Sequence, residues 1–255
     1  EGVLEVGPDN WKRYNVNLGV QTTVNSWLDV RGKFIFSQTN RTEPYTHLSS
    51  TYDAWYYLYR WPRTYPYGTY EGRPFRSAVT DVQQANESNR TATLSRLSVG
   101  GTAHLVEGLT LDADFTYARN NSHTHQTGGA IEGYNFWAGG GSLNYGVYSP
   151  SNFDHVNYTS AWDQRANLRA VATYTRDLAD HSFKILGGGE SELFEDWWQS
   201  SRRNDLLDPE KGELGLANGD QFANGGHGHW ATLGFFGRLN YSFQDKYLLQ
   251  LNARF

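Results

Sequence analysis

The strongest constraint on the fold is a period of two in the residues at the end of the chain. From Leu233 to Tyr241 every second residue is apolar or glycine, and the pattern resumes from Tyr247 to Phe255 after a short turn at residues 243–246. Successive side chains on a β-strand point to opposite faces of the sheet. One face of this hairpin is therefore apolar and aromatic, and the other is mostly polar. Such a hairpin either covers a protein core or forms the wall of a membrane barrel.

The same arrangement occurs three more times along the chain. The apolar positions of the paired strands lie in Tyr14–Val20 with Val30–Phe36, in Leu97–Leu105 with Leu109–Tyr117, and in Ala166–Tyr174 with Phe183–Gly187. Short turns join the two strands of each hairpin, whereas segments of about 40 residues or more, far beyond a usual hairpin loop, join successive hairpins. We expect these segments to be irregular surface loops, because they keep no sustained alternation and are rich in Gly, Asn, Ser, Tyr and Trp.

Short turns at one rim and long loops at the other are the organisation of outer-membrane β-barrels. Aromatic residues also gather beside the short turns, where a girdle at the boundary between lipid and water is expected; they are Trp27, Tyr174, Phe183, Tyr241, Phe243 and Tyr247. We therefore predict an all-β fold: about eight antiparallel strands of a transmembrane β-barrel, with short periplasmic turns and long extracellular loops. A soluble β-sandwich or β-propeller, whose apolar strand faces cover a core, is the alternative that the pattern leaves open.

Composition agrees with a barrel. Only 38% of the 255 residues are hydrophobic and only 19% are charged, while 15% are aromatic. This balance suits strands with one face in water, and the sequence has no apolar run of the roughly 20 residues that a membrane helix needs. The net charge of −5 without a long basic run gives no case for nucleic-acid binding. The absence of cysteine excludes disulfides, thiolate nucleophiles and cysteine metal sites.

The sequence argues against catalysis and against a bound metal. Asp112 and Asp114 share one strand face, but we interpret them as solvated charges that face the barrel lumen rather than as an acid–base pair. The histidine pairs in 123–125 and 227–229 are interpreted as surface histidines rather than as halves of a metal site. The acidic residues in 190–196 fit no calcium-loop spacing. We predict no catalytic residue, no metal and no cofactor.

Two aromatic stretches suggest where a ligand could bind. The segment Tyr52–Tyr70 gathers tyrosine and tryptophan rings around two arginines, and Trp197–Trp198 is a second, weaker candidate. Flat rings with polar tips suit sugar faces or peptide side chains. The candidate ligand-binding residues are Tyr52, Trp55, Tyr56, Tyr59, Arg60, Trp61, Tyr65, Trp197 and Trp198. The alternative role of these rings is to pack a long loop against the rest of the molecule.

Three blocks of sequence carry a family resemblance. The most specific is Phe-Phe-Gly-Arg-Leu-Asn-Tyr at 235–241 followed by Asp-Lys-Tyr-Leu-Leu at 245–249. The others are Tyr-Pro-Tyr-Gly-Thr-Tyr at 65–70 and Tyr-Asn-Val-Asn-Leu at 14–18. Together, and in the family's order along the chain, they resemble the SusC/RagA family of TonB-dependent transporters from the outer membrane of Bacteroidetes.

The resemblance implies a barrel of twenty-two strands that is filled by an N-terminal plug. It also implies import of a nutrient, an oligosaccharide or an oligopeptide, together with a SusD-like surface lipoprotein that acts as a hinged lid, and with energy from the TonB complex. Residues 1–255 would then be part of one barrel in the membrane lipid of a bacterial outer membrane, without the plug and the N-terminal domain. The implied protein is a transporter and not an enzyme.

Two alternatives remain open at this point. One is a secreted glycan-binding or glycan-cleaving β-domain, and the other is a free-standing eight-stranded outer-membrane barrel. The direction of the apolar strand faces separates the transporter from a secreted domain. A transporter requires that no packed protein core covers the side chains of Leu111, Phe115, Leu168, Phe235 and Leu249.

Overall fold

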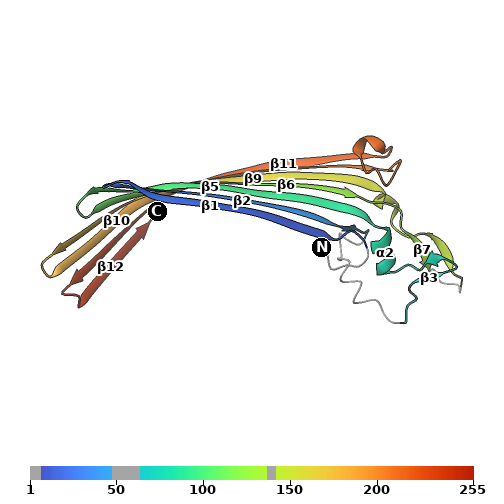
Figure 1. Ribbon diagram of the computed structural model, residues 1–255, viewed down its shortest axis with the longest axis horizontal. Coiled ribbons are helices and arrows are strands. Elements are labelled where there is room, and N and C mark those ends of the chain that lie inside the picture. Colours follow the sequence, from blue (N-terminus) through green and yellow to red (C-terminus); the bar gives the residue numbers. More distant parts are fainter. Residues whose placement is uncertain (1–6, 48–63, 137–141) are drawn as a thin grey trace.

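The computed structural model describes residues 7–47, 64–136 and 142–255. Its main element is one antiparallel sheet of eight strands, in the order β1-β2-β5-β6-β9-β10-β11-β12 (Figure 1). The strands are β1 (Asn10–Asn25), β2 (Leu28–Tyr45), β5 (Asn86–Val106), β6 (Leu109–Thr127), β9 (His155–Leu178), β10 (His181–Asn204), β11 (Gln221–Phe243) and β12 (Tyr247–Arg254). Each strand of this sheet pairs with the next one along the chain. The predicted eight antiparallel strands are confirmed.

The connections alternate in length as predicted. At one end of the sheet the four hairpin turns lie at residues 26–27, 107–108, 179–180 and 244–246. Gly108 adopts a φ of +80° in its turn, a conformation that glycine takes without a steric penalty. At the other end the connections are residues 46–85, 128–154 and 205–220.

The long connections contain short ordered elements. The first holds β3 (Thr69–Tyr70), β4 (Arg73–Pro74) and the helix α2 (Ala78–Gln84). The second holds β7 (Glu132–Asn135), β8 (Asn144–Val147) and the 3-10 turn η1 (Ser151–Phe153), and the third holds the 3-10 turn η2 (Leu214–Leu216). No helix in the described residues is long and apolar enough to cross a membrane.

The strands are longer than the alternation predicted, and the long connections are correspondingly shorter. Strands β9 and β10 have 24 residues each, whereas a tilted strand needs only about 9–11 residues to cross a bilayer. The expectation of irregular structure was wrong for the ends of these segments, because β2 continues to Tyr45 and β5 already begins at Asn86. Beyond the apolar stretch both faces of the sheet mix polar and aromatic residues, so hydrophobic alternation did not reveal that the strands continue.

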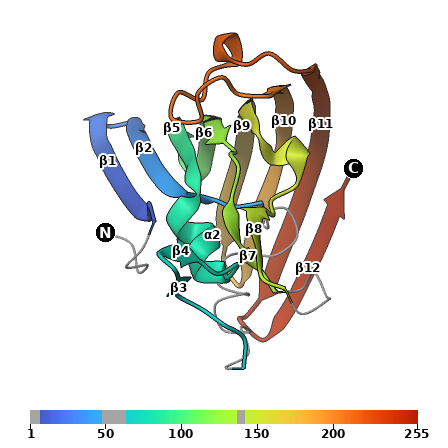
Figure 2. The ribbon, with the colours of Figure 1, turned by 90° about the vertical axis from the view of Figure 1, so that its right-hand side faces the viewer.

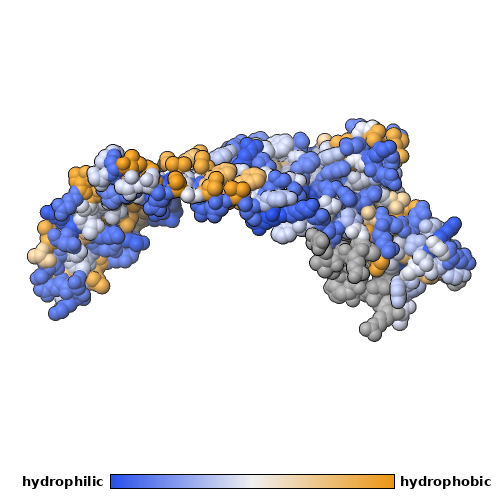
Figure 3. Space-filling view, in the orientation of Figure 1, coloured by the Kyte–Doolittle hydropathy of each residue, from blue (hydrophilic) through white to orange (hydrophobic). Residues whose placement is uncertain are grey.

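The register aligns the apolar positions into one band. Directly paired residues of an antiparallel sheet project to the same face, and one such row holds Val20, Gly32, Val99, Phe115, Leu168, Ser191 and Leu233. We call this side the outer face and its uncharged part the apolar band. In the described strands the band includes Leu97–Leu105, Leu109–Tyr117 and Ala166–Tyr174, each with the roughly 9–11 residues of a membrane crossing. In Figure 3 hydrophobic colour gathers along the middle of the arch and near the short turns.

No packed core covers the apolar band within the described residues. Leu111, Phe115, Leu168, Phe235 and Leu249 are between 38% and 56% exposed. The prediction that these side chains do not face a protein core is confirmed. Aromatic side chains lie near the short turns, where the rings of Phe183 and Tyr241 are 4.9 Å apart.

The sheet is open rather than closed into a small barrel. Strands β1 and β12 form its two edges, and no pairing joins them in the described residues (Figure 2). A free-standing eight-stranded barrel would need this pairing. That alternative therefore does not describe the structure.

The buried apolar residues lie at the end of the long connections. Ala78 and Val82 of α2, Ile131 and Tyr134 beside β7, and Phe153 of η1 are all at most 8% exposed. Helix α2 and the β7–β8 hairpin lie beneath the concave side of the arch (Figure 1). We call this ordered part of residues 64–85 and 128–154 the loop cap.

Candidate ligand-binding face

The face opposite the apolar band is mostly polar, and we call it the inner face. It carries Arg31, Asp112 and Asp114 at the depth of the apolar band. The inner-face residues Tyr45 and His155 contact the loop cap, because their rings lie 5.2 Å and 5.6 Å from the ring of Phe153. The inner face is thus the concave side of the arch in Figure 1.

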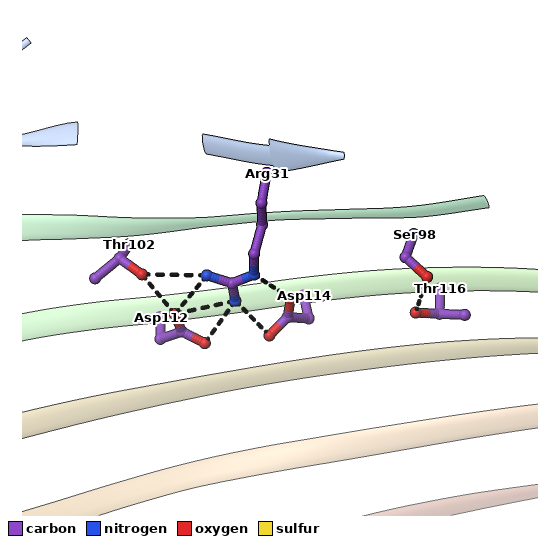
Figure 4. Close-up of polar contacts among 6 residues, drawn as sticks. All are labelled: Arg31, Ser98, Thr102, Asp112, Asp114 and Thr116. Carbon is purple, nitrogen blue, oxygen red and sulfur yellow. Dashed lines mark hydrogen bonds and ion pairs between the residues drawn. The ribbon is translucent and has the colours of Figure 1, made fainter. Parts of the chain in front are cut away.

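Asp112 and Asp114 lie on the inner face, as predicted, but they are not free carboxylates. Arg31 Nη2 lies 2.9 Å from Asp112 Oδ1 and 2.7 Å from Asp114 Oδ2 (Figure 4). Thr102 Oγ1 also donates a hydrogen bond to Asp112 at 2.6 Å. Both carboxylates therefore share the guanidinium of Arg31 as their ion-pair partner, so neither is a free general base. Sequence reasoning missed Arg31, since it is separated from Asp112 by 81 positions.

Glycines on the inner face let side chains reach across a strand. Arg31 on β2 contacts Asp114 on β6 by passing over Gly100 of β5, where an added Cβ would lie 2.2 Å from Asp114 Oδ1. In the same way Arg254 on β12 pairs with Glu190 on β10 across Gly234 of β11. The Arg31–Asp114 contact needs a bare backbone at the middle strand, whereas an added Cβ at Gly234 would meet its nearest atom at 3.4 Å, an ordinary contact.

A third glycine on the inner face seats an aromatic ring. Gly188 of β10 lies under Phe236 of β11, with an ideal Cβ position 2.9 Å from the ring. Arg169 of β9 lies over the same ring, 5.5 Å from its centroid. Each of the three glycines thus lies on the strand between two strands whose side chains contact each other.

A hollow of about 640 Å³ lies on the half of the sheet nearer the long connections. Its lining combines polar with apolar and aromatic residues and includes Arg13, Ser37, Arg90, Asn120, Ser122, Asp163, Phe194, Asp196 and Trp198. Trp162 and Trp197 also border the hollow, although strand alternation turns their side chains to the outer face. Asn120 donates a hydrogen bond to Asp163 at 2.8 Å. Asp196 on β10 lies directly opposite Asp163 on β9. Its carboxylate has no ion-pair partner in the described residues. The hollow therefore combines hydrogen-bonding groups with an indole ring of Trp198 that is 39% exposed.

An aromatic patch adjoins this hollow on the inner face. The rings of Phe194 and Trp230 stack with centroids 5.4 Å apart. Arg165 lies over both rings, at 5.4 Å from Phe194 and 5.9 Å from Trp230, and its Nε lies 3.2 Å from Glu192 Oε1. Rings held in this way present flat apolar surface for stacking. We call the hollow and this patch together the candidate groove.

The two tryptophans that the sequence analysis grouped lie on opposite faces. Trp198 faces the candidate groove, while Trp197 pairs with Trp162 on the outer face, where Arg119 lies 4.8 Å from the centroid of the Trp162 ring. Strand alternation requires this separation of neighbouring residues. Sequence reasoning missed Phe194, although the same alternation was a signal for it. Phe194 lies four positions before Trp198 and therefore on the same face.

The remaining predicted residues fall largely outside the described part of the chain. Tyr52, Trp55, Tyr56, Tyr59, Arg60 and Trp61 lie in residues 48–63, outside the described residues. Tyr65 is described, and its ring lies 5.5 Å from that of Phe136. Tyr65 therefore contacts the second long connection and does not line the candidate groove.

Hydrogen bonds hold the two connections of the loop cap together. Gln84 donates a side-chain hydrogen bond to the carbonyl of Glu132 and accepts one from its backbone N–H, both at 2.8 Å. Ser77 caps the N-terminus of α2 by accepting from the Thr80 N–H at 3.1 Å. Tyr148 OH donates a hydrogen bond of 2.5 Å to Asp81. The cap is therefore an ordered body rather than two separate loops.

Burial perturbs the titration of the loop cap. It raises the pKa of Asp81 to about 6, against the opposing effects of the Tyr148 hydrogen bond and the Arg76 charge. Burial also raises the pKa of Tyr148, and Asp81 adds to this effect. The pKa of His47 falls to about 4, because burial and the charge of Arg76 both disfavour its protonated form. The guanidinium of Arg76 lies 4.9 Å from the centroid of the Tyr148 ring.

The architecture is similar to that of solved transporters. The chain superposes on the RagAB peptide transporter with a TM-score of 0.70 and 16% identity, over 97% of this chain and 28% of that chain. The fold is that of part of this transporter's barrel. The RagAB peptide importer in the "closed-closed" state matches with a TM-score of 0.65 and 18% identity, over 97% and 28% of the two chains. This chain thus spans about 28% of the RagAB chain that it resembles.

No protein-family model matches the sequence. No curated protein matches it either. Structural likeness at this low identity establishes the barrel architecture, and any activity has to be argued from the faces of the sheet.

Proposed function

We propose that the chain is a barrel segment of a TonB-dependent transporter of the SusC/RagA family in a bacterial outer membrane. The observation that supports this most is the two-faced sheet. Its outer face carries an uncharged band of membrane-crossing length, and its inner face carries ion pairs and hydrogen-bonded polar groups. The sequence resemblance and the RagAB architecture support the same family independently.

A segment of this kind requires further strands. In lipid the unpaired backbone groups at the edges β1 and β12 would each lack a hydrogen-bond partner. We therefore place residues 1–255 within one larger barrel, whose plug and TonB-contacting parts are outside this chain. The SusD-like lid lipoprotein is the proposed partner at the long connections.

The proposed cargo is a nutrient, either an oligopeptide or an oligosaccharide, that contacts the candidate groove. The solved relatives are described as a peptide transporter and importer, which favours an oligopeptide. The rings of Trp198 and Trp230 can stack on apolar side chains or sugar faces, while Asp163, Asp196 and Asn120 offer hydrogen bonds. The segment Tyr52–Trp61 of the first long connection is a second proposed source of ligand-binding rings.

Fractionation of cells tests the location. The full protein should be found in the outer-membrane fraction and should need detergent for its extraction. Recovery in the soluble secreted fraction would contradict the transporter and would favour the secreted glycan-binding domain instead.

Paired tryptophan substitutions test the binding face. Trp198→Ala and Trp230→Ala remove inner-face rings, and Trp197→Ala and Trp162→Ala are matched controls that remove outer-face rings. Loss of one stacking ring should weaken cargo binding about tenfold, equivalent to about 1.4 kcal/mol. Binding is measured on the purified transporter with peptide and glycan mixtures that the cells can grow on. Equal effects of inner and outer substitutions would refute the proposed binding face.

A further inference from the structure

The inner face around the candidate groove carries opposite charges on its two sides. Residues that pair directly across the strands form rows, and the rows from that of Ile35 to that of Arg41 cross the hollow. In these rows the charged residues of β1, β2 and β5 are all basic; they are Arg13, Arg41, Arg90 and Arg96. Those of β9 and β10 are Arg165, Asp163 and Asp196. Strand β6 lies between the two groups, and its residues in these rows are the uncharged Ala118, Asn120, Ser122 and Thr124.

Ion pairs neutralise one cation on each side. Arg41 pairs with Glu43, and Arg165 Nε lies 3.2 Å from Glu192 Oε1. Within the described residues no ion pair involves the other charged members of these rows, which are Arg13, Arg90 and Arg96 on one side and Asp163 and Asp196 on the other. The groove therefore keeps a positive side on β1 and β5 and a negative side on β9 and β10, with the neutral strand β6 between them.

The carboxylates of the negative side lie where the neighbouring strand supplies no cation. Asp163 and Asp196 are directly opposite each other, and like charges in this arrangement destabilise a sheet. The residue opposite Asp196 on β11 is Gly228, which has no side chain. A cation from outside the sheet would relieve the repulsion between the two carboxylates.

The surroundings of these carboxylates favour an organic cation. Phe194 and Trp198 lie two positions before and after Asp196 on β10, so their rings face the same way as its carboxylate. An ammonium or guanidinium group can bond to a carboxylate and lie over an aromatic ring at the same time. The described residues contain no group of three or more side chains that fits a metal ion.

The positive side offers guanidinium groups to a carboxylate. Arg13 and Arg90 both line the hollow. Arg13 Nε donates hydrogen bonds to neutral acceptors, at 3.1 Å to Asn15 Oδ1 and at 3.2 Å to Ser37 Oγ. Arg90 lies directly opposite Arg41, so like charges adjoin on this side as well. The planar guanidinium matches the two oxygens of a carboxylate, so a carboxylate is the anion that fits this side.

The spacing of the strands sets the length of a ligand that reaches both sides. Neighbouring strands lie about 4.8 Å apart, so β5 and β9, with β6 between them, are about 10 Å apart along the sheet. Strand β1 is two strands farther and is therefore about 19 Å from β9. An extended peptide advances about 3.3–3.6 Å per residue, so a chain of roughly three to six residues spans these distances.

We propose that the candidate groove selects a dipolar cargo, with its cationic group at Asp163 and Asp196 and its carboxylate at Arg13 and Arg90. This inference rests on the proposed function, because it takes the inner face as the side that meets the cargo. A short oligopeptide with free termini carries both groups, whereas a neutral oligosaccharide carries neither. The charges also fix the direction of the bound chain, with its amino end toward β9 and β10 and its carboxyl end toward β1 and β5.

Peptides with blocked ends test this selection on the unsubstituted protein. Mixed tetrapeptides of uncharged residues are prepared with both ends free, with the amino end acetylated, with the carboxyl end amidated, and with both ends blocked. The full protein, purified in detergent, is equilibrated with each set, and the bound peptides are quantified by mass spectrometry. Blocking either end should weaken binding about tenfold, because a hydrogen bond between charged groups is lost. A neutral oligosaccharide should not compete with the peptides.

Substitutions then assign each end to one side of the groove. Asp163→Asn and Asp196→Asn should weaken binding of peptides with a free amino end about tenfold and should leave amino-acetylated peptides unaffected. Arg13→Gln and Arg90→Gln should weaken binding of peptides with a free carboxyl end about tenfold and should leave carboxyl-amidated peptides unaffected.

The outer face supplies matched controls. Glu195 on β10 and Arg119 on β6 belong to one outer-face row, so Glu195→Gln and Arg119→Gln remove the same kinds of charge from the opposite face. Both variants should bind all four sets of peptides as the unsubstituted protein does.

Five results would overturn the selection. They are equal binding of free and blocked peptides, no binding of the free peptides, an effect of the aspartate variants on the carboxyl end, equal effects of the outer-face controls, and binding of calcium alone that Asp163→Asn abolishes. Each of these results leaves the transporter intact if the protein still fractionates with the outer membrane and needs detergent for its extraction. Recovery of the protein in the soluble secreted fraction would instead contradict the proposed function.

Discussion

The buried carboxylate of Asp81 should destabilise the loop cap less at pH 5 than at pH 7.5. Asp81 is 5% exposed, and burial raises its pKa to about 6 from an ordinary value of about 4. The folded cap therefore binds this proton more tightly than the opened cap does. The stability that Asp81 contributes is fully present below about pH 4 and is lost as the pH rises through about 6.

The magnitude follows from the pKa difference between the two states. About two pKa units correspond to about 3 kcal/mol. At pH 7.5 the ionised Asp81 costs the folded cap nearly all of this free energy, and at pH 5 it costs about half, or about 1.5 kcal/mol. Lowering the pH from 7.5 to 5 should thus shift the opening equilibrium of the cap by roughly tenfold through this residue alone.

A histidine that packs against the cap, His47, has the opposite effect. The pKa of His47 is lowered to about 4, so its contribution is present above its ordinary pKa and is lost as the pH falls. The informative quantity is therefore the difference between the wild-type protein and Asp81→Asn, in which the histidine contribution cancels. The asparagine keeps an oxygen that can accept the hydrogen bond from Tyr148.

Hydrogen exchange of the amides in α2 and β7 measures cap opening at each pH, after correction for intrinsic rates. Asp81→Asn should protect these amides more than the wild type by about 3 kcal/mol at pH 7.5 and by about 1.5 kcal/mol at pH 5. Asp208→Asn is the control, because Asp208 lies in the third long connection and pairs with Lys211. A difference that stays constant with pH, or an asparagine variant that is less protected at pH 7.5, would refute the reasoning.

Three further substitutions, two of them with matched controls, test the two faces of the sheet, with stability measured by denaturant unfolding in detergent. Gly188→Ala should cost about 1–3 kcal/mol, because its Cβ would lie 2.5 Å from a backbone oxygen, whereas Gly187→Ala has no atom within 4 Å and should be nearly neutral. Gly100→Ala should cost a similar amount by displacing the ion pair that crosses it. Leu233→Arg on the outer face should cost about 2–4 kcal/mol, whereas Thr232→Arg on the inner face should be tolerated. Equal costs within either matched pair would contradict the assignment of the faces.

The sequence predicted the hairpins well because two signals coincide in them. The apolar period along Leu109–Tyr117 shows which side faces away from water, and the turn at Gly108 fixes where the strand reverses. Register follows from the two together. The faces of Trp197 and Trp198 were also readable, because the period that starts at Phe183 continues through both residues.

Other features had no local signal in the sequence. The contact of Arg31 with Asp112 joins residues 81 positions apart, and it depends on the missing side chain of a glycine on the strand between them. Helix α2 has only seven residues, too few to show a helical period. The ends of β9 and β10 that adjoin the long connections are largely polar on both faces of the sheet. Only the hydrogen-bonded pairing of the backbone therefore reveals that the strands extend so far.

Polar contacts on the outer face locate the candidate groove relative to the membrane. Just beyond the apolar band, Tyr117 OH donates a hydrogen bond to Gln164 at 2.8 Å, and Gln164 donates one to Glu195 at 2.6 Å. A charged carboxylate and an amide that face outward belong in water or among lipid headgroups, because hydrocarbon offers them no partner. Asp163 and Trp198 lie next to these positions and farther from the short turns than the band. The candidate groove therefore lies beyond the apolar band on the side of the long connections, which is the extracellular side in the proposed transporter.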